Sequence, residues 1–504
     1  MKYWLGLDVG TSSVKAVAIG AEGEVAASAR CPYVTHRSGP EMAEQDPADY
    51  LKAVRTTISA LEIDSTKIAA VGLSGHTPTT VLVDENDEPV RPAMTWQDRR
   101  AEEEAQVLSR RHPDPIGLFG TPLYWSPTAI PAKLLWLSRH EPGTVANTRW
   151  ILQPKDYIGL ALTGAPTSDP WSSKGLCNVV TGAPASAFLR SVGWSDGVCP
   201  PIDHAWNYRG AVTEIAAHEF GLPDGIPVAV GWSDALAAML RVGAFTSQTA
   251  FIISGTSDIV GSTFRGDAPD VPGLLTIPRE CAPLPATYGP IQSSGDSLEW
   301  LARILGRSVS DLMFLQPSPA VEPPTFVPYL RGERAPYWNL RVRGGFSGLS
   351  AEHNAGDLVQ GAMEGISFAA RRILDNIGVG ESSEVHLAGV GAEERWAQVR
   401  AATLGRPIVI HKDGDAAAVG AAILGAAASG QDIAAVVSRV SRNAQRVDPA
   451  PSDAEDARRR FAAFGRLSAF ALAETASPAP SKRGDIVYEN AGSNRDSIEG
   501  RRAQ

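Results

Sequence analysis

A short turn motif occurs twice in this 504-residue chain, and it restricts the fold more than any other feature. Residues 5–15 read Leu-Gly-Leu-Asp-Val-Gly-Thr-Ser-Ser-Val-Lys, and residues 251–261 read Phe-Ile-Ile-Ser-Gly-Thr-Ser-Asp-Ile-Val-Gly. Each copy is an apolar run, then Gly-Thr-Ser, then a second apolar run, a pattern that predicts a β-hairpin. Because the copies lie about half a chain apart, we expect two similar halves that each present one hairpin turn.

The repeat also predicts how the chain divides. We expect a first domain over residues 1–244 and a second over residues 245–474, with the boundary close to Gly243. Residues 475–504 alternate Pro, Ser, Gly and charged residues without an apolar period, so they are predicted to form a disordered tail.

Strand and helix patterns alternate along the first half. Apolar runs predict strands, and a helical pattern starts at Pro47, where Asp46 is suited to be the N-cap. Further helices are expected to dominate to about Thr163. Strands mixed with helices in this way indicate the α/β class. The predicted strands are Trp4–Leu7, Val14–Ile19, Val25–Ala27, Ile68–Ser74 and Thr80–Asp84, and the first predicted helix is Pro47–Leu61.

Composition and charge exclude several classes of protein. Hydrophobic residues make up 43% and charged residues 20% of the chain, which is typical of globular proteins. The net charge of −10 implies no broad basic surface, so nucleic acid is not an expected partner. The longest apolar stretch, Ala416–Ala428, is too short to span a bilayer, and the N-terminus does not resemble a signal peptide. We therefore expect a cytoplasmic protein without a membrane partner.

The four cysteines point the same way. Cys31, Cys177, Cys199 and Cys281 are scattered and form no C-x-x-C pair. This spacing favours reduced thiols of a cytosolic protein over a disulfide framework or a zinc site.

Two common nucleotide-binding signatures are missing. The chain contains no Gly-Lys dipeptide, which excludes a Walker A loop. The run that starts at Gly389 is the nearest approach to G-x-G-x-x-G, but it lacks the third glycine.

The Gly-Thr-Ser turns are nevertheless suited to bind phosphate. Glycine lets the backbone approach an oxyanion, several N–H groups can point at it, and the hydroxyls add donors. Asp8 directly precedes the first turn and would repel phosphate unless a divalent cation lay between them, as in a Mg-nucleotide site. The alternative is a structural β-turn in which Asp8 binds its own backbone.

Asp234 is the second carboxylate of interest. It follows the strand-like run Ile226–Val230 and opens a helix of small residues. This is the position at which α/β sheets bind ligands, at the carboxyl end of a strand. The alternative is that Asp234 is only the N-cap of that helix.

Taken together, these segments resemble the FGGY carbohydrate kinases, and within them the xylulokinase-like members. The similarity runs from Tyr3 to about Leu472. The segments that carry it, in family order, are residues 5–15, 43–47, 73–75, 92–100, 154–157, 255–257, 328–336, 343–349, 362–366, 387–392 and 419–422.

The resemblance implies a fold and an activity. The fold is two actin/hexokinase-type (ribonuclease H-like) domains that face each other across a cleft. The activity is ATP-dependent phosphorylation of a hydroxyl of a small sugar or polyol, in particular a ketopentose. Asp234 would be the general base, Asp8 would lie near Mg²⁺, and a homodimer is left open. The residues implied to hold the ATP phosphates are Gly10, Thr11, Ser12, Gly255, Thr256 and Ser257. Those implied to lie beside adenosine are Gly389, Gly391, Ala392 and Gln398. Those implied to contact the sugar, together with Asp234, are His76, Thr77, Trp96, Asp98 and Arg99.

The chain departs from the xylulokinase pattern mainly around the sugar. Residues 76–79 read His-Thr-Pro-Thr in place of Gln-Met-His-Gly, and Ala235 stands where an amide usually follows the base. Smaller departures are Val390 between two glycines and Asp415 in place of a common Glu. Since discrimination among polyols depends on a few hydrogen bonds, we expect D-xylulose not to be the best acceptor.

Other interpretations remain open at this point. One is a catalytically lapsed sugar- or nucleotide-binding regulator on the same fold, and another is an actin-like ATPase without a small acceptor. At the level of single residues, Trp96 could belong to the core, and Asp98 and Arg99 could form a local surface ion pair.

Overall fold

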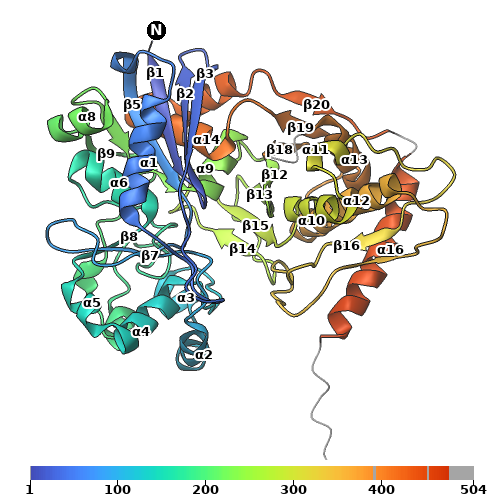
Figure 1. The fold of residues 1–504 in the computed structure, drawn as a ribbon, viewed down its shortest axis with the longest axis horizontal. Helices are drawn as coiled ribbons and strands as arrows, with labels where there is room; N and C mark the ends of the chain where they lie inside the picture. The colour runs from blue at the N-terminus through green and yellow to red at the C-terminus, as the bar shows by residue number, and fades with distance from the viewer. Residues whose placement is uncertain (1, 390–392, 451–452, 476–504) are drawn as a thin grey trace, which may run out of the picture.

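Two seven-stranded mixed sheets form the centres of the two halves, which lie side by side (Figure 1). The computed structural model describes residues 2–389, 393–450 and 453–475. The first sheet has the order β3-β2-β1-β5-β10-β9, with β11 also paired to β5. Its strands are β1 (Tyr3–Val9), β2 (Ser13–Gly20), β3 (Val25–Pro32), β5 (Ile68–Gly75), β9 (Tyr208–Ala211), β10 (Pro227–Ala229) and β11 (Trp232–Ser233).

The second sheet has the order β14-β15-β13-β12-β18-β19-β20. In both sheets, an antiparallel hairpin lies beside a strand that runs parallel to its first member: β1 with β2 and β5, and β12 with β13 and β18. The predicted repeat is therefore confirmed as two similar sheets. The strands are β12 (Ala250–Ser254), β13 (Asp258–Thr263), β14 (Leu275–Ile277), β15 (Ala286–Ile291), β18 (Val385–Gly389), β19 (Ile408–His411) and β20 (Gln445–Val447).

Helices α1, α6 and α8 cover one face of the first sheet, because their apolar side chains share a buried cluster with Leu5, Leu7 and Val71. A group of short helices and strands below the sheet has its own buried cluster. The covering helices are α1 (Pro47–Ser59), α6 (Pro154–Thr163) and α8 (Glu214–Phe220). The lower group comprises β4 (Glu44–Gln45), β6 (Val81–Val83), β7 (Ala93–Met94), α2 (Glu102–Arg111), α3 (Ile116–Phe119), α4 (Ile130–His140), α5 (Pro142–Asn147), β8 (Trp150–Leu152) and α7 (Ser186–Ser191).

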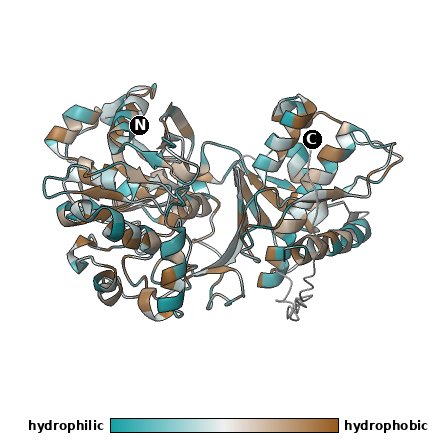
Figure 2. Cartoon of the chain, turned by 60° about the horizontal axis from the view of Figure 1, so that its bottom comes forward, coloured by the Kyte–Doolittle hydropathy of each residue, from teal (hydrophilic) through white to brown (hydrophobic). Residues whose placement is uncertain are grey.

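The second half surrounds its sheet with longer helices and a short hairpin. Its remaining elements are α10 (Gly295–Leu305), α11 (Val309–Leu312), β16 (Thr325–Val327), β17 (Gly345–Ser347), α12 (Ala355–Ile377), α13 (Glu394–Leu404), α15 (Ile433–Val440) and α16 (Asp453–Ala473). Figure 2 shows hydrophilic and hydrophobic residues alternating along the outer helices of both halves. This amphipathic pattern is expected of helices that cover a sheet.

Several predicted elements differ at their ends. The first helix begins at Pro47, and the Asp46 side chain accepts a hydrogen bond from the Ala48 N–H, so the predicted N-cap is confirmed. The helix ends at Ser59, two residues before the predicted end. The strand predicted over Thr80–Asp84 is the shorter β6 (Val81–Val83). The predicted tail, apart from Thr475, lies outside the described residues.

Helix α14 (Ala416–Ala428) belongs to the second half of the sequence but packs on the first sheet (Figure 1). The approach is so close that it leaves no room for side chains. A Cβ on Gly72 would lie 1.7 Å from the Ala421 carbonyl oxygen, and one on Gly6 would lie 1.9 Å from that of Ala418. Because α14 comes from the second half of the sequence and packs on the sheet of the first half, the domain boundary at residue 244 stays a prediction.

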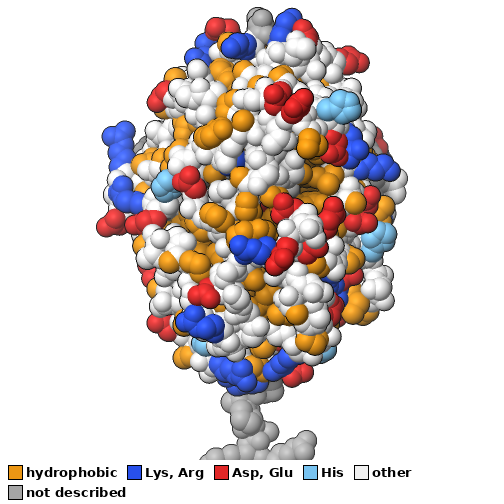
Figure 3. Space-filling model, turned by 90° about the vertical axis from the view of Figure 1, so that its left-hand side faces the viewer, with side chains coloured by type: hydrophobic (Ala, Val, Ile, Leu, Met, Phe, Trp, Pro, Cys, Tyr) orange, Lys and Arg blue, Asp and Glu red, His pale blue; other side chains and the backbone are white. Residues whose placement is uncertain are grey.

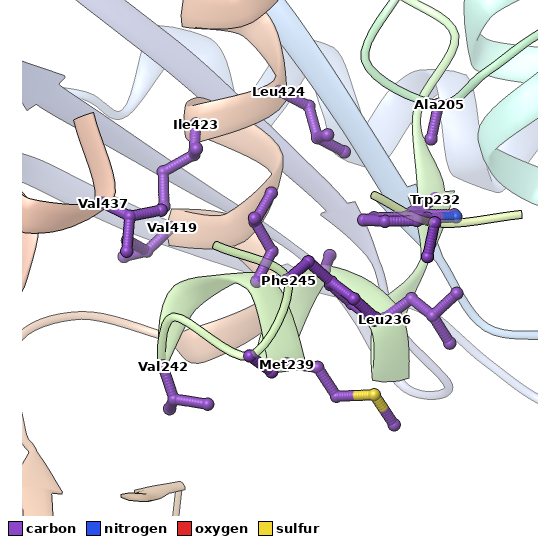
Figure 4. Close-up of a cluster of buried hydrophobic side chains, with 14 of the residues drawn as sticks. Ala205, Trp232, Leu236, Met239, Val242, Phe245, Val419, Ile423, Leu424 and Val437 are labelled. Carbon is purple, nitrogen blue, oxygen red and sulfur yellow. The ribbon is translucent and has the colours of Figure 1, made fainter. Parts of the chain in front are cut away.

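The other neighbour of α14 is α9 (Asp234–Arg241), again at close range. A Cβ on Gly420 would lie 1.8 Å from the Ala237 carbonyl oxygen. Figure 4 shows side chains of both helices in one buried cluster, with Ile423 and Leu424 from α14 and Leu236 and Met239 from α9. The small residues of α14 thus let one helix contact a sheet and another helix at once.

The surface, the helices and the cysteines can be compared with what composition predicts. Lys and Arg are interspersed with Asp and Glu over the face drawn in Figure 3, without a broad patch of one sign. Within the described ranges, every helix is too short or too polar to cross a bilayer. Cys31 is half-buried, and Cys177, Cys199 and Cys281 are buried as free thiols.

The close packing of α14 against the first sheet can be tested by a substitution at Gly72. Replacement by alanine puts a methyl group against the α14 backbone, and such overpacking typically costs about 1–3 kcal/mol. We therefore expect Gly72→Ala to lower the urea midpoint of unfolding, measured by circular dichroism. Gly143→Ala is the control, because no atom lies within 4 Å of its added Cβ. Equal midpoints for the two variants would contradict the close packing.

Candidate active site

Three parallel strands end at the same edge of the first sheet. In β1, Asp8 pairs in register with Ser74 of β5, and on the other side of β5, Trp232 of β11 pairs with the same Ser74. Asp234 follows β11 directly and is the first residue of α9. The fold therefore brings together two carboxylates that lie more than 200 residues apart in the sequence.

A lysine and a third carboxylate complete this group. Lys15 of β2 places its Nζ 2.6 Å from Asp415 Oδ2 and 3.8 Å from Asp8 Oδ2. Asp415 is the N-cap of α14, and its Oδ1 accepts hydrogen bonds from the Ala417 and Ala418 N–H groups at 3.2 Å. The acid reaches the edge because α14 packs on β1 and β5.

Burial and mutual repulsion raise the pKa values of the two strand-end carboxylates. Burial raises the pKa of Asp8 to about 7; the charges of Asp415 and Asp234 add to this, while Lys15 and the Ser74 hydroxyl oppose it. Burial also raises the pKa of Asp234 to about 6, against the opposing effects of the Ala235 N–H and Lys15. Asp234 is thus largely ionised at neutral pH, yet is a stronger base than an ordinary aspartate.

Neither carboxylate makes the hydrogen bond that its structural alternative required. Asp8 Oδ1 accepts a hydrogen bond from the Ser74 hydroxyl at 2.9 Å, and not from its own turn. The N-cap of α9 is Ser233, whose side chain accepts from the Leu236 N–H. Asp234 Oδ1 accepts from the Ala235 N–H at 2.7 Å, which leaves Oδ2 without a hydrogen bond among the described residues.

The first Gly-Thr-Ser turn is held from three sides. Its own backbone closes it, through the Gly10 N–H and the Ser13 carbonyl at 3.0 Å, and the Tyr33 hydroxyl donates to the Gly10 carbonyl. The Thr11 carbonyl accepts from the Gln45 amide at 2.8 Å, and the Thr11 hydroxyl accepts from the Trp96 indole N–H at 3.0 Å. Ser12 is exposed. The turn is therefore fixed in position and linked directly to Trp96.

The second turn rests on the start of α10. The N–H groups of Ser294 and Gly295 donate to the carbonyls of Thr256 and Gly255 at 3.1 Å. Thr256 is exposed, and Ser257 is partly buried. No carboxylate here corresponds to Asp8, because the equivalent sequence position is Ile253.

Behind the second turn lies a buried ion pair that the sequence analysis did not identify. Arg400 donates to Asp258 Oδ2 at 2.8 Å, and both side chains are completely buried. The Ser254 hydroxyl donates to the other oxygen of Asp258 at 2.8 Å. Since an unpaired buried charge is costly, this pair fixes the base of the hairpin.

Of the predicted adenosine residues, Gly389 and Gln398 are described, whereas Gly391 and Ala392 lie outside the described residues. Gly389 ends β18 next to the second turn, with φ +98°, and a Cβ there would lie 1.9 Å from the Ser254 carbonyl oxygen. Only glycine fits this position. Gln398 is exposed on α13.

The predicted sugar loop follows β5 directly. His76 is buried, and its Nδ1 lies 2.8 Å from the Thr79 hydroxyl, which also accepts from the Trp96 N–H. The other ring nitrogen, Nε2, is buried and has no hydrogen-bond partner among the described residues. Burial, with the charge of Lys133, lowers the pKa of His76 to about 3, so the ring is neutral. Thr77 is partly buried beside it.

Lys133 of α4 fixes this loop and was not identified from the sequence. Its side chain is fully buried, and Nζ donates to the carbonyls of Pro78, Met94 and Thr95 at 2.8–3.1 Å. Burial lowers the pKa of Lys133 to about 7. A lysine in an apolar helix gives no signal of this role, because its acceptors are backbone carbonyls from two distant segments.

Trp96, Asp98 and Arg99 have different environments. Trp96 is partly buried and is not a core residue. Asp98 is buried and pairs with Arg100 at 2.7 Å, while the exposed Arg99 lies 3.7 Å from Glu41. The alternative of an Asp98–Arg99 ion pair is therefore wrong. Since Asp98 also accepts from the Ala43 N–H at 2.8 Å, its contact with a sugar stays a prediction.

The surroundings of Asp8 fit a nucleotide-bound Mg²⁺. Oδ1 is engaged by Ser74, whereas Oδ2 faces the first turn, since a Cβ on Gly10 would lie 3.2 Å from it. Within the described ranges, no group of three or more His, Cys, Asp or Glu side chains could hold a metal ion. A Mg²⁺ ion at this position would thus be held by Asp8 and by phosphate oxygens, as is usual for this ion.

Comparison with known proteins covers most of the chain. Residues 3–241 match the N-terminal domain and residues 250–429 the C-terminal domain of the FGGY family of carbohydrate kinases. The chain is 28% identical to the xylulose kinase of Escherichia coli (strain K12), over 84% of this chain and 89% of that protein. It is 26% identical to the gluconokinase of Bacillus subtilis (strain 168), over 97% and 99%. The solved xylulose kinase of Rhodospirillum rubrum superposes with a TM-score of 0.82 at 25% identity, over 94% and 99%.

Proposed function

Because the chain belongs to the FGGY family of carbohydrate kinases, we propose that it transfers the γ-phosphoryl group of ATP to a hydroxyl of a ketopentose. The family consists of phosphotransferases that use ATP and an alcohol group as acceptor. The observation that carries the proposal is the position of Asp234: its Oδ2 accepts no hydrogen bond from the described residues, and it lies at the same sheet edge as Asp8 and the first turn. The proposed setting is the cytoplasm, with no nucleic-acid or membrane partner, and a homodimer is left for test.

In this proposal, Asp234 acts as the general base. Its Oδ2 accepts the proton of the attacking hydroxyl, while the Ala235 N–H holds Oδ1 and fixes the orientation of the carboxylate. A base with a pKa of about 6 is ionised at neutral pH and still has useful proton affinity. A general base of this kind typically contributes a factor of about 10² to 10⁴ in rate.

The two turns would hold the phosphates of the nucleotide. Backbone N–H groups and hydroxyls of Gly10, Thr11 and Ser12 on one side, and of Gly255, Thr256 and Ser257 on the other, supply donors to phosphate oxygens. Mg²⁺ bound by Asp8 would neutralise charge on the phosphates. Gly389 and Gln398, with Gly391 and Ala392, are proposed to contact adenosine.

The acceptor would lie against the loop after β5. Nε2 of His76 is a buried polar atom without a partner among the described residues, and a hydroxyl of the acceptor would satisfy it. Trp96 supplies an aromatic ring next to it, held by Thr79 and Thr11. Thr77, Asp98 and Arg99 are proposed as further contacts. Since polar partners of a buried polar atom give strong discrimination, this loop is expected to determine the sugar.

The role of Asp234 is tested by Asp234→Asn. The amide is nearly isosteric but accepts no proton at neutral pH, so kcat should fall by a factor of about 10² to 10⁴. Binding of MgATP, measured by calorimetry, should be retained. Asp224→Asn, the same change on an exposed loop, should leave kcat unchanged. Near wild-type kcat in a folded Asp234→Asn protein would remove this residue from the mechanism.

The raised pKa of Asp234 also predicts the pH dependence. The base must be ionised, and its pKa of about 6 lies above the ordinary value of 3.8, so kcat/KM should decline as the pH falls through about 6. The measurement is kcat/KM for the acceptor at saturating MgATP from pH 5 to 8, with recovery of activity on return to pH 7.5 as control. A flat profile down to pH 5 would contradict the assignment.

The third test concerns the acceptor. Residues 76–79 and Ala235 depart from the xylulokinase pattern, so we expect another ketose or polyol to exceed D-xylulose in kcat/KM. Coupled ADP release should be measured over pentuloses, hexuloses, polyols and sugar acids. D-xylulose ahead of all others by tenfold, about 1.4 kcal/mol, would show that these substitutions do not alter specificity. No turnover with any acceptor would support the catalytically lapsed regulator instead.

A further inference from the structure

Lys15 is placed unevenly between two carboxylates. Its cross-strand neighbour in the β1–β2 register is Asp8, and opposite charges in this position normally pair with each other. Yet Nζ lies 2.6 Å from Asp415 Oδ2 and 3.8 Å from Asp8 Oδ2. The closer partner is a residue 400 positions away in the sequence.

The two oxygens of Asp415 have separate contacts. Oδ1 caps α14 by accepting hydrogen bonds from the N–H groups of Ala417 and Ala418. Oδ2 accepts a hydrogen bond from the ammonium group of Lys15. The helix itself is held in place by its contacts with Gly6 and Gly72. Asp415 is therefore a rigidly placed acceptor, whereas Lys15 has a flexible four-carbon side chain.

Only one oxygen of Asp8 accepts a hydrogen bond, and the other has a longer ion-pair contact with Lys15 at 3.8 Å. Ser74 donates to Oδ1, and among the described residues Oδ2 accepts no hydrogen bond, although it faces the first turn. An ammonium that moved about 1 Å closer to Oδ2 would change this 3.8 Å contact into a hydrogen-bonded ion pair with the buried Asp8. That ion pair would occupy the oxygen that a divalent cation needs.

We propose that Asp415 is a positioning residue that holds Lys15 away from Asp8 and so keeps Asp8 Oδ2 open to the Mg²⁺ of the nucleotide. The inference rests on the proposed function, because it takes the ligand to be a Mg-nucleotide. It assigns Asp415 a role beyond capping a helix. It also explains why α14, from the second half of the chain, has to begin at the edge of the first sheet.

The test uses a substitution that separates capping from ion pairing. Asp415→Asn keeps an N-cap, since asparagine caps as well as aspartate, but removes the charge that holds Lys15. We expect the dissociation constant for Mg²⁺ in the presence of saturating ADP, measured by calorimetry, to rise tenfold or more. This readout needs no turnover. Asp432→Asn, the same change at the N-cap of α15, is the matched control and should bind Mg²⁺ like the wild type.

A double mutant distinguishes this role from simple attraction between Asp415 and the cation. If Asp415 acts through Lys15, then Asp415→Asn should change Mg²⁺ affinity by less than twofold in a Lys15→Met background. The same loss in both backgrounds would overturn the proposal, and so would unchanged affinity in Asp415→Asn alone. Should the asparagine variant unfold at lower urea, Asp415→Ser supplies a second uncharged cap.

The outcome is separable from that of the proposed function. A wild-type protein that binds Mg·ADP but phosphorylates no acceptor would contradict the proposed activity. The Mg²⁺ affinities of the single and double mutants would still test the proposed role of Asp415 through Lys15. A wild-type protein that turns over while Asp415→Asn keeps full Mg²⁺ affinity would contradict only the present inference.

Discussion

The close packing of α14 against the first sheet is the contact on which the rest of the structure depends. Gly6 and Gly72 on the sheet, and Gly420 on the helix, lack the side chains that would hold these backbones apart. This contact joins the two halves of the chain. It also places the start of α14, and with it Asp415, at the strand ends that carry Asp8 and Asp234. A helix rich in Ala and Gly without a strong amphipathic pattern is thus a structural requirement here.

The site that results has an excess of negative charge around one lysine. Three carboxylates surround Lys15; burial opposes its positive charge, but the carboxylates outweigh burial, and the pKa of Lys15 is raised. Burial, and after it the charge of Asp415, raises the pKa values of Asp8 and Asp234. A divalent cation bound at Asp8 would offset part of this excess. We therefore regard the acidic character of the site as a property suited to a Mg-nucleotide.

The sequence predicted those parts of the site that local pattern controls. Asp8 and Asp234 each follow an apolar strand, and the paired turns repeat a visible motif, so strand ends and turns could be identified. The roles of Asp415, Lys133 and Arg400 could not be predicted, because they depend on partners that only the tertiary fold brings near. The same limit explains the wrong Asp98–Arg99 pair: adjacent residues point in different directions, and Asp98 is bound by Arg100. The contact of α14 with β1 likewise has no local signal.

The central claim is that the acceptor hydroxyl meets Asp234 at the edge of the first sheet. A crystal structure of the protein with Mg²⁺, a non-hydrolysable ATP analogue and its best acceptor would test this claim most directly. The account predicts one acceptor hydroxyl within about 2.6–3.2 Å of Asp234 Oδ2, with that oxygen in line with the γ-phosphorus. An acceptor whose hydroxyls all lie beyond hydrogen-bond distance of Asp234, with another side chain at the attacking oxygen, would contradict it.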